Sequence, residues 1–184
     1  MLAPALILDG LDVTERAECA LVAALLRRTR KLQSVTHVEL RCAAELPPRL
    51  FTQRWSIVWL RSHVTHYRKR TPIASIERRD GCVFRQLLRH EDLARIDARV
   101  LVLSGCYTAD SILGEQEYAA DIVLAHSGKL FHTPALLFAG AFVSVLTARM
   151  RRDYLPADMV RYAFDHAHRL LRVPEDRWRF LKGA

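Results

Sequence analysis

Short apolar runs alternate with amphipathic stretches along most of this chain. Residues 5–8 (ALIL), 34–40 (SVTHVEL), 55–60 (WSIVWL) and 99–106 (RVLVLSGC) have the length and the Val, Ile and Leu content of β-strands. An almost unbroken apolar run such as 55–60 is typical of a parallel strand that is buried on both faces. The pattern therefore predicts an α/β fold, a three-layer sandwich with a mainly parallel sheet.

Helical patterns fill the first and last intervals. Residues 15–32 predict a helix, with Asp12 as its N-cap and Glu15 three residues later, as in a capping box. Residues 155–171 predict a second amphipathic helix near the end of the chain. The apolar stripe expected on the first helix consists of Ala17, Ala20, Leu21, Ala24, Leu25 and Leu32.

The middle of the chain is harder to divide into elements. Residues 68–81 are polar and could hold a hairpin, and residues 82–96 read as a helix. Residues 133–141 (TPALLFAGA) predict a helix, and 142–148 (FVSVLTA) predict a further strand because β-branched residues recur there. Residues 121–128 fit a strand or the start of a helix, and residues 174–184 fit a closing turn or strand.

Length and composition predict one folded domain over residues 1–184. The chain has 184 residues, of which 51% are hydrophobic, enough for a core that needs no disulfides. Neither a signal peptide nor a membrane span is predicted, so we expect a cytoplasmic protein with reduced thiols. The four cysteines form no CxxC pair, and the histidines at 126, 132, 166 and 168 do not suggest a metal site. Cys19 lies within the first helical pattern and is read as a core residue.

The chain is basic, with a net charge of +8 and a pI near 9.8. Its arginines are dispersed over several predicted elements, and no aromatic-rich basic stripe or nucleic-acid motif accompanies them. A solvated surface or an acidic protein partner is therefore favoured. A basic α/β module that binds nucleic acid remains an alternative.

Two predicted strands end close to reactive side chains, His63 after 55–60 and Cys106 after the run at 99–104. Ligand and catalytic groups in parallel sheets lie beyond the carboxyl ends of the strands. A histidine can accept the proton of a cysteine thiol and later protonate a leaving amine. If the two residues are not catalytic, Cys106 is a small core residue and His63 is a surface or structural residue. His66 competes with His63 for the role of base but lies further from the strand end.

The residues around both strand ends resemble those of CHAT-type caspase-like peptidases. LVLSGCYT (101–108) is similar to that family's nucleophile strand, roughly V-V-L-S-A-C-E-T, and IVWLRSHV (57–64) is similar to its histidine strand. The sequence ALLFAGAFVSVLTA (135–148) resembles the family segment in which an Ala-Gly-Ala turn precedes a strand. Residues 157–183 resemble its final helix and closing strand. The matching segments follow one another in the family's order over most of the chain.

This resemblance implies a caspase-hemoglobinase fold and a cysteine endopeptidase that needs no metal or other cofactor. Cys106 would be the nucleophile and His63 the general acid/base, with the backbone N–H groups of Val64 and Cys106 holding the oxyanion. The implied partners are a protein substrate and a regulatory protein, in bacterial antiviral defence or cell death. Asp110 and Glu115 follow the nucleophile and could line a pocket for a basic substrate residue, or belong to a solvated loop.

One departure from the family pattern concerns the oxyanion site. Val64 stands where the family has glycine, and valine disfavours backbone angles that glycine adopts. The sequence therefore leaves open a catalytically impaired relative that serves as an interaction subunit.

Overall fold

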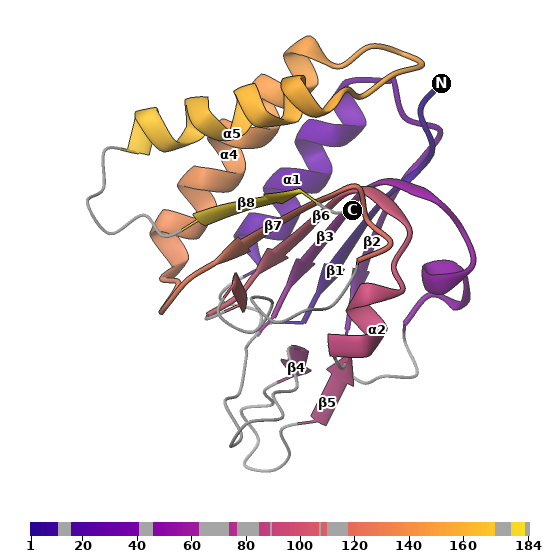
Figure 1. Cartoon of the computed structure of the whole chain (residues 1–184), viewed down its shortest axis with the longest axis vertical. Coiled ribbons are helices and arrows are strands. Elements are labelled where there is room, and N and C mark those ends of the chain that lie inside the picture. Colours follow the sequence, from indigo (N-terminus) through magenta and orange to yellow (C-terminus); the bar gives the residue numbers. More distant parts are fainter. Residues whose placement is uncertain are drawn as a thin grey trace.

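The chain folds around a six-stranded β-sheet with helices on its faces (Figure 1). This computed structural model describes residues 1–10, 16–40, 46–62, 74–76, 85–88, 90–106, 108–109, 118–171 and 178–182. The strands lie across the sheet in the order β2 (Val35–Glu39), β1 (Ala5–Asp9), β3 (Trp55–Arg61), β6 (Ala98–Ser104), β7 (Ile122–His126) and β8 (Trp178–Lys182). All neighbours are parallel except β7 and β8, which are antiparallel. The predicted α/β class and mainly parallel sheet are confirmed.

Each face of the sheet has its own hydrophobic core, because successive strand residues point to opposite faces. On one face, Ile57 and Trp59 belong to a core shared with the long helices. On the other face, Val58 and Leu60 pack with residues of the short helices and connecting segments. The long helices are α1 (Ala17–Arg28), α4 (His132–Arg149) and α5 (Ala157–Leu171), and the short ones are η3 (Pro48–Phe51) and α2 (His90–Ala94). This arrangement is compatible with a three-layer sandwich.

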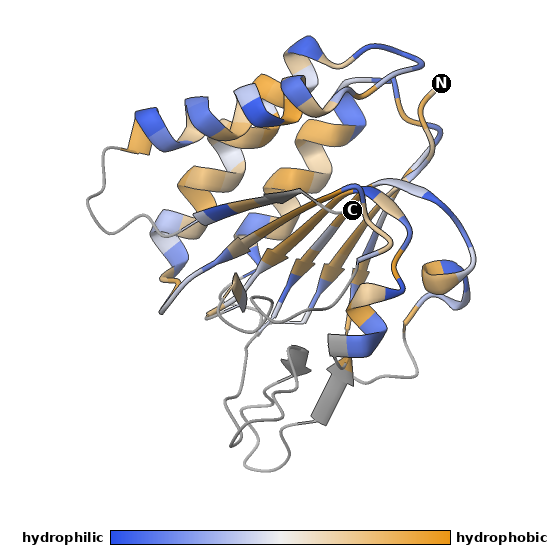
Figure 2. Cartoon of the chain, in the orientation of Figure 1, coloured by the Kyte–Doolittle hydropathy of each residue, from blue (hydrophilic) through white to orange (hydrophobic). Residues whose placement is uncertain are grey.

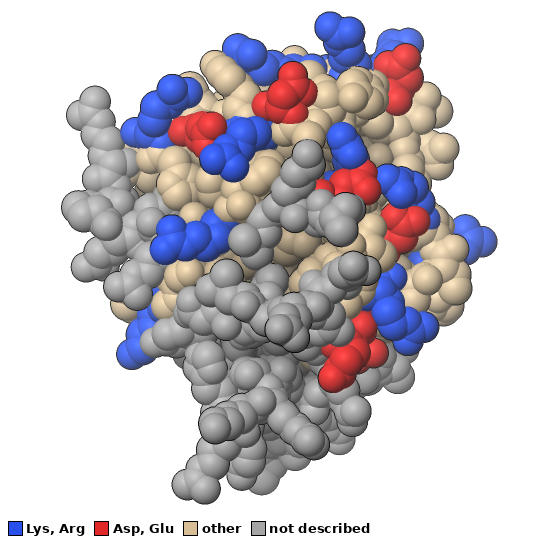
Figure 3. All heavy atoms as spheres, viewed as in Figure 1, with Lys and Arg blue, Asp and Glu red and all other residues tan. Residues whose placement is uncertain are grey.

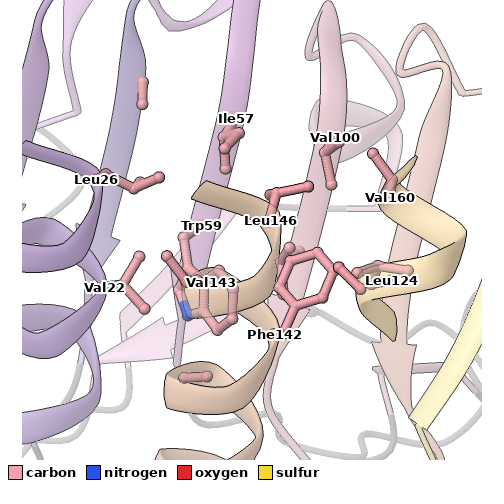
Figure 4. Packing of buried hydrophobic residues seen from close by; sticks show 14 of the residues in the cluster. Val22, Leu26, Ile57, Trp59, Val100, Leu124, Phe142, Val143, Leu146 and Val160 are labelled. Carbon is pink, nitrogen blue, oxygen red and sulfur yellow. The ribbon is translucent and has the colours of Figure 1, made fainter. Parts of the chain in front are cut away.

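Aromatic and branched side chains fill the core beneath the long helices. Trp59 of β3 is fully buried and lies 6.3 Å, between ring centroids, from Phe142 of α4. Figure 4 shows Val22 and Leu26 of α1 close to the same tryptophan. Figure 2 shows that the central strands of the sheet are hydrophobic over most of their length. Strands buried in this way need no polar alternation, which explains the unbroken apolar runs in the sequence.

Helix α1 presents a different face to the core from the predicted one. Its buried residues are Glu18, Cys19, Val22, Ala23 and Leu26, whereas Ala17, Ala20 and Ala24 are exposed. The prediction was wrong for these three alanines, whereas Leu32 is buried and Leu25 packs against the core, as predicted. The described helix starts at Ala17, and the predicted cap Asp12 lies outside the described residues.

The strand predicted at residues 142–148 is wrong. These residues form the second half of helix α4. The helix runs unbroken through Gly140, so the Ala-Gly-Ala sequence is not a turn. A Cβ atom at Gly140 would lie 3.3 Å from Cδ2 of Leu21 in α1. The glycine therefore permits close packing of α1 and α4. Burial between α1, α5 and the sheet outweighs the modest β preference of Val143 and Val145.

The segment predicted as a helix at 82–96 is also divided differently. Residues Arg85–Leu88 form strand β5, which pairs antiparallel with β4 (Ala74–Ile76) in a small separate sheet, and only His90–Ala94 are helical. The hairpin predicted from 68–81 thus extends further along the chain. No helix in the described part of the chain is long and apolar enough to cross a membrane.

Substitution of Gly140 tests the close contact between α1 and α4. We expect Gly140→Val to destabilise the protein by about 1 to 3 kcal/mol, because the added methyl groups must displace Leu21. In a Leu21→Ala background the same substitution should cost much less. Thermal unfolding monitored by circular dichroism measures both effects. Equal losses in the two backgrounds would contradict the contact.

Candidate functional site

A row of polar residues crosses the carboxyl ends of four neighbouring strands. The strand registers place Glu39 of β2 beside Asp9 of β1, Asp9 beside Arg61 of β3, and Arg61 beside Ser104 of β6. Asp9, Arg61 and Ser104 are all buried. Catalytic and binding groups collect at this edge in parallel sheets, so the row marks the candidate site.

A buried ion pair forms the centre of this row. Nε of Arg61 lies 3.1 Å from Oε2 of Glu18, and these side chains are 4% and 0% exposed. The indole N–H of Trp59 donates to Oε1 of the same glutamate at 2.9 Å. Nη1 of Arg61 also donates to the backbone carbonyl of Ser104 at 3.2 Å. The guanidinium therefore connects helix α1 to the end of strand β6.

Opposing effects act on the carboxyl group of Glu18. Burial raises its pKa, because an ionised carboxylate loses its hydration in the interior. The Arg61 guanidinium and the hydrogen bond from Trp59 favour the ionised form and oppose that rise. The pair explains why the buried face of α1 contains a glutamate.

A second cluster lies beside this ion pair and joins three elements. The ligand atoms of Asp9, Cys19 and His37 all lie within 4.8 Å of one another, and Nε2 of His37 is 3.7 Å from Oδ2 of Asp9. Cys19 is fully buried, so its thiol cannot reach a peptide substrate. Burial and the nearby carboxylates of Asp9 and Glu18 raise the pKa of that thiol. Its proximity to imidazole and carboxylate groups instead makes it a candidate metal ligand.

The sequence analysis recognised Cys19 only as a core residue and did not select Asp9, Glu18, His37 or Arg61. Two signals were available. Asp9 ends an apolar strand abruptly, and Arg61 does the same for β3. Each places a charge where a doubly buried strand reaches its carboxyl end, which a structure tolerates only with a partner.

Cys106 occupies the turn after strand β6, as predicted, and is half-buried. The backbone N–H of Leu130 donates to its Sγ at 3.3 Å, and Sγ lies 3.8 Å from the carbonyl oxygen of the same residue. The thiol is therefore held against the segment that leads from β7 into α4. Unlike Cys19, it retains exposure to solvent.

The Thr108 hydroxyl links the turn that contains Cys106 to the neighbouring strand β7. Its buried hydroxyl donates to the carbonyl of Leu103 at 2.9 Å and accepts the backbone N–H of His126 at 2.8 Å. The hydroxyl thus connects the end of β6 to the end of β7. The position of Cys106, two residues earlier, depends on this bridge.

The remaining predicted site residues lie outside the described residues. They are His63, Val64, Asp110 and Glu115, together with the alternative base His66. The structure therefore describes the nucleophile candidate and the strand that precedes His63, but not the histidine itself.

No protein-family model matches this chain, and no curated protein is significantly similar to it. The arrangement of the residues is therefore the basis for assigning a function.

Replacement of Glu18 tests the buried ion pair. We expect Glu18→Gln to destabilise the protein by about 3 to 5 kcal/mol, because the buried Arg61 guanidinium would lose the carboxylate that it contacts at 3.1 Å. The double variant Glu18→Leu/Arg61→Met should recover much of that loss. Chemical denaturation measures both effects.

The ion pair between Arg16 and Glu39 supplies the matched control. It lies at the start of the same helix but is more exposed, so Arg16→Ala should cost no more than about 1 kcal/mol. A comparable loss in the two single variants would show that burial does not set the strength of the central pair.

Thr108→Val should destabilise the protein by about 1 to 3 kcal/mol, because the similarly shaped side chain leaves the buried N–H of His126 unpaired. Thr108→Ser keeps the hydroxyl and should cost clearly less. Denaturation curves of the two variants, compared with the parent, check this. A serine variant as unstable as the valine variant would mean that the methyl group, not the hydroxyl, matters.

Proposed function

We propose that this protein is a cysteine endopeptidase of the caspase-like CHAT type, with Cys106 as nucleophile and His63 as general acid/base. The register of two central strands is the observation that carries this proposal. Arg61 and Ser104 are direct partners in the parallel pair of β3 and β6. His63 and Cys106 each follow two residues after these partners. Neighbouring strands lie about 4.8 Å apart. The segments that lead from Arg61 toward His63 and from Ser104 toward Cys106 therefore start side by side.

The chemistry follows from these two residues. His63 accepts the thiol proton of Cys106, and the sulfur attacks the carbonyl carbon of the scissile peptide. The backbone N–H groups of Cys106 and Val64 hold the resulting oxyanion. His63 then gives its proton to the leaving amine as the C–N bond breaks, which leaves a thioester. His63 next takes a proton from water, whose oxygen displaces the thiolate and releases the new carboxyl end.

The fold provides further but coarser support. The mainly parallel sheet, its antiparallel edge strand and the order of α5 and β8 agree with a caspase-hemoglobinase sandwich. The part of the resemblance based on residues 135–148 is withdrawn, because that segment is one helix. The two strand ends and the final helix and strand still support the family assignment.

The proposed reaction needs a protein substrate and no cofactor, and a regulatory protein would control it in the cytoplasm during defence or cell death. A substrate with a basic residue at the cleavage site would suit a pocket lined by Asp110 and Glu115. The regulatory partner follows from the family resemblance, and the pocket residues Asp110 and Glu115 lie outside the described residues.

A catalytically impaired interaction subunit is the second candidate. Val64 replaces the family glycine, and Sγ of Cys106 already contacts both backbone groups of Leu130, as a purely structural thiol would. Nucleic-acid binding has less support. Among the described residues on the face shown in Figure 3, Lys and Arg are interspersed with Asp and Glu and are not gathered into one basic stripe.

Labelling with a peptidyl acyloxymethyl ketone tests the dyad. Probes with Arg or Leu next to the reactive group should modify Cys106, identified by mass mapping. We expect His63→Ala to slow the labelling about 10²- to 10⁴-fold, since the base that activates the thiol is lost. Cys106→Ala should remove the modification.

His66→Ala is the matched control, because it removes the neighbouring histidine three residues further on. It should leave the labelling rate nearly unchanged. If Cys106 reacts equally in all the histidine variants, or no faster than Cys42 and Cys82, the dyad is not functional and the interaction subunit is favoured.

A further inference from the structure

We propose that Asp9, Cys19 and His37 form a binding site for a divalent transition-metal ion of the zinc class. The site lies at the carboxyl end of β1, beside the middle of β2 and against the first turn of α1, and is independent of the proposed peptidase activity. Its residues come from three different elements, so an ion there would tie the edge of the sheet to the first helix.

The donor set matches this class of metal. Thiolate, imidazole and carboxylate are the three ligand types that zinc binds in proteins, and cobalt(II) occupies the same sites. Their ligand atoms already lie within 4.8 Å of one another, so small side-chain movements would bring them into coordination. Three protein ligands leave a fourth position for water or a further side chain.

The charge of the surroundings favours a cation. Two buried carboxylates, those of Asp9 and Glu18, lie near a single buried guanidinium, that of Arg61. Arg61 is directed to Glu18 at 3.1 Å and to the Ser104 carbonyl at 3.2 Å. His37 ligates a metal through a neutral imidazole nitrogen, and Glu39, the register partner of Asp9, pairs with Arg16 at the same edge.

The environment of Cys19 suits metal binding and not peptide cleavage. The thiol is fully buried, so no peptide can reach it, whereas a small ion can. The side chain of His37 is 17% exposed on an edge strand, which gives an ion a route from solvent. A thiol binds a metal as the thiolate, so binding releases the thiol proton.

Titration with cobalt(II) tests the site through the near-ultraviolet charge-transfer band that a thiolate ligand produces. The full-length protein should show this band, release about one proton per ion, and lose the band when zinc is added. A variant with Cys42→Ser, Cys82→Ser and Cys106→Ser keeps Cys19 as its only cysteine and should behave like the parent.

Cys19→Ser and His37→Gln should each abolish the band. His37→Gln is the safer variant because this residue lies on an edge strand, and circular dichroism verifies that it is folded. His166→Gln, in helix α5, is the matched control and should keep full binding. The proposal is wrong if the parent shows no band, if the band survives Cys19→Ser or His37→Gln, or if the triple-serine variant loses it.

Discussion

The buried ion pair between Glu18 and Arg61 is the contact on which the arrangement of this molecule depends. Removing both charges from water is costly, and the cost is recovered only where each group has good partners. Here the glutamate also accepts the indole N–H of Trp59, and the arginine also donates to the Ser104 carbonyl. These contacts join the first turn of α1 to β3, on the same helix face that buries Cys19, Val22 and Leu26. They also fix the position of α1 over β3 and the end of β6.

That constraint creates two very different thiol environments at one edge of the sheet. Cys19 turns inward beside Glu18 and is sealed from solvent, near a carboxylate and an imidazole. Cys106 follows the strand end that Arg61 holds, and remains half-buried in a turn secured by Leu130 and Thr108. Accessibility, not residue type, is the reason why we propose metal binding for the first thiol and nucleophilic chemistry for the second.

Most of the sheet could be predicted from sequence, because doubly buried strands leave a strong local signal. The errors arose where burial overrode local preference. The β-branched residues Val143 and Val145 suggested a strand, but Gly140 allows α4 to continue against Leu21 of α1. Residues Arg85–Leu88 were predicted to be helical but form a strand, because they pair with β4. The position of Cys106 at a strand end was confirmed, whereas His63, Val64, Asp110 and Glu115 lie outside the described residues.

The sequence by itself determined the fold class, most strands of the large sheet and the placement of a cysteine after a central strand. These follow from hydrophobic periodicity, which depends only on neighbours along the chain. Only the tertiary structure decided which residues meet across the sheet. The register that joins Arg61 to Ser104, and the meeting of Asp9, Cys19 and His37, connect residues far apart in sequence. No local pattern records such contacts, because they depend on the strand order and on which face of α1 packs against the sheet.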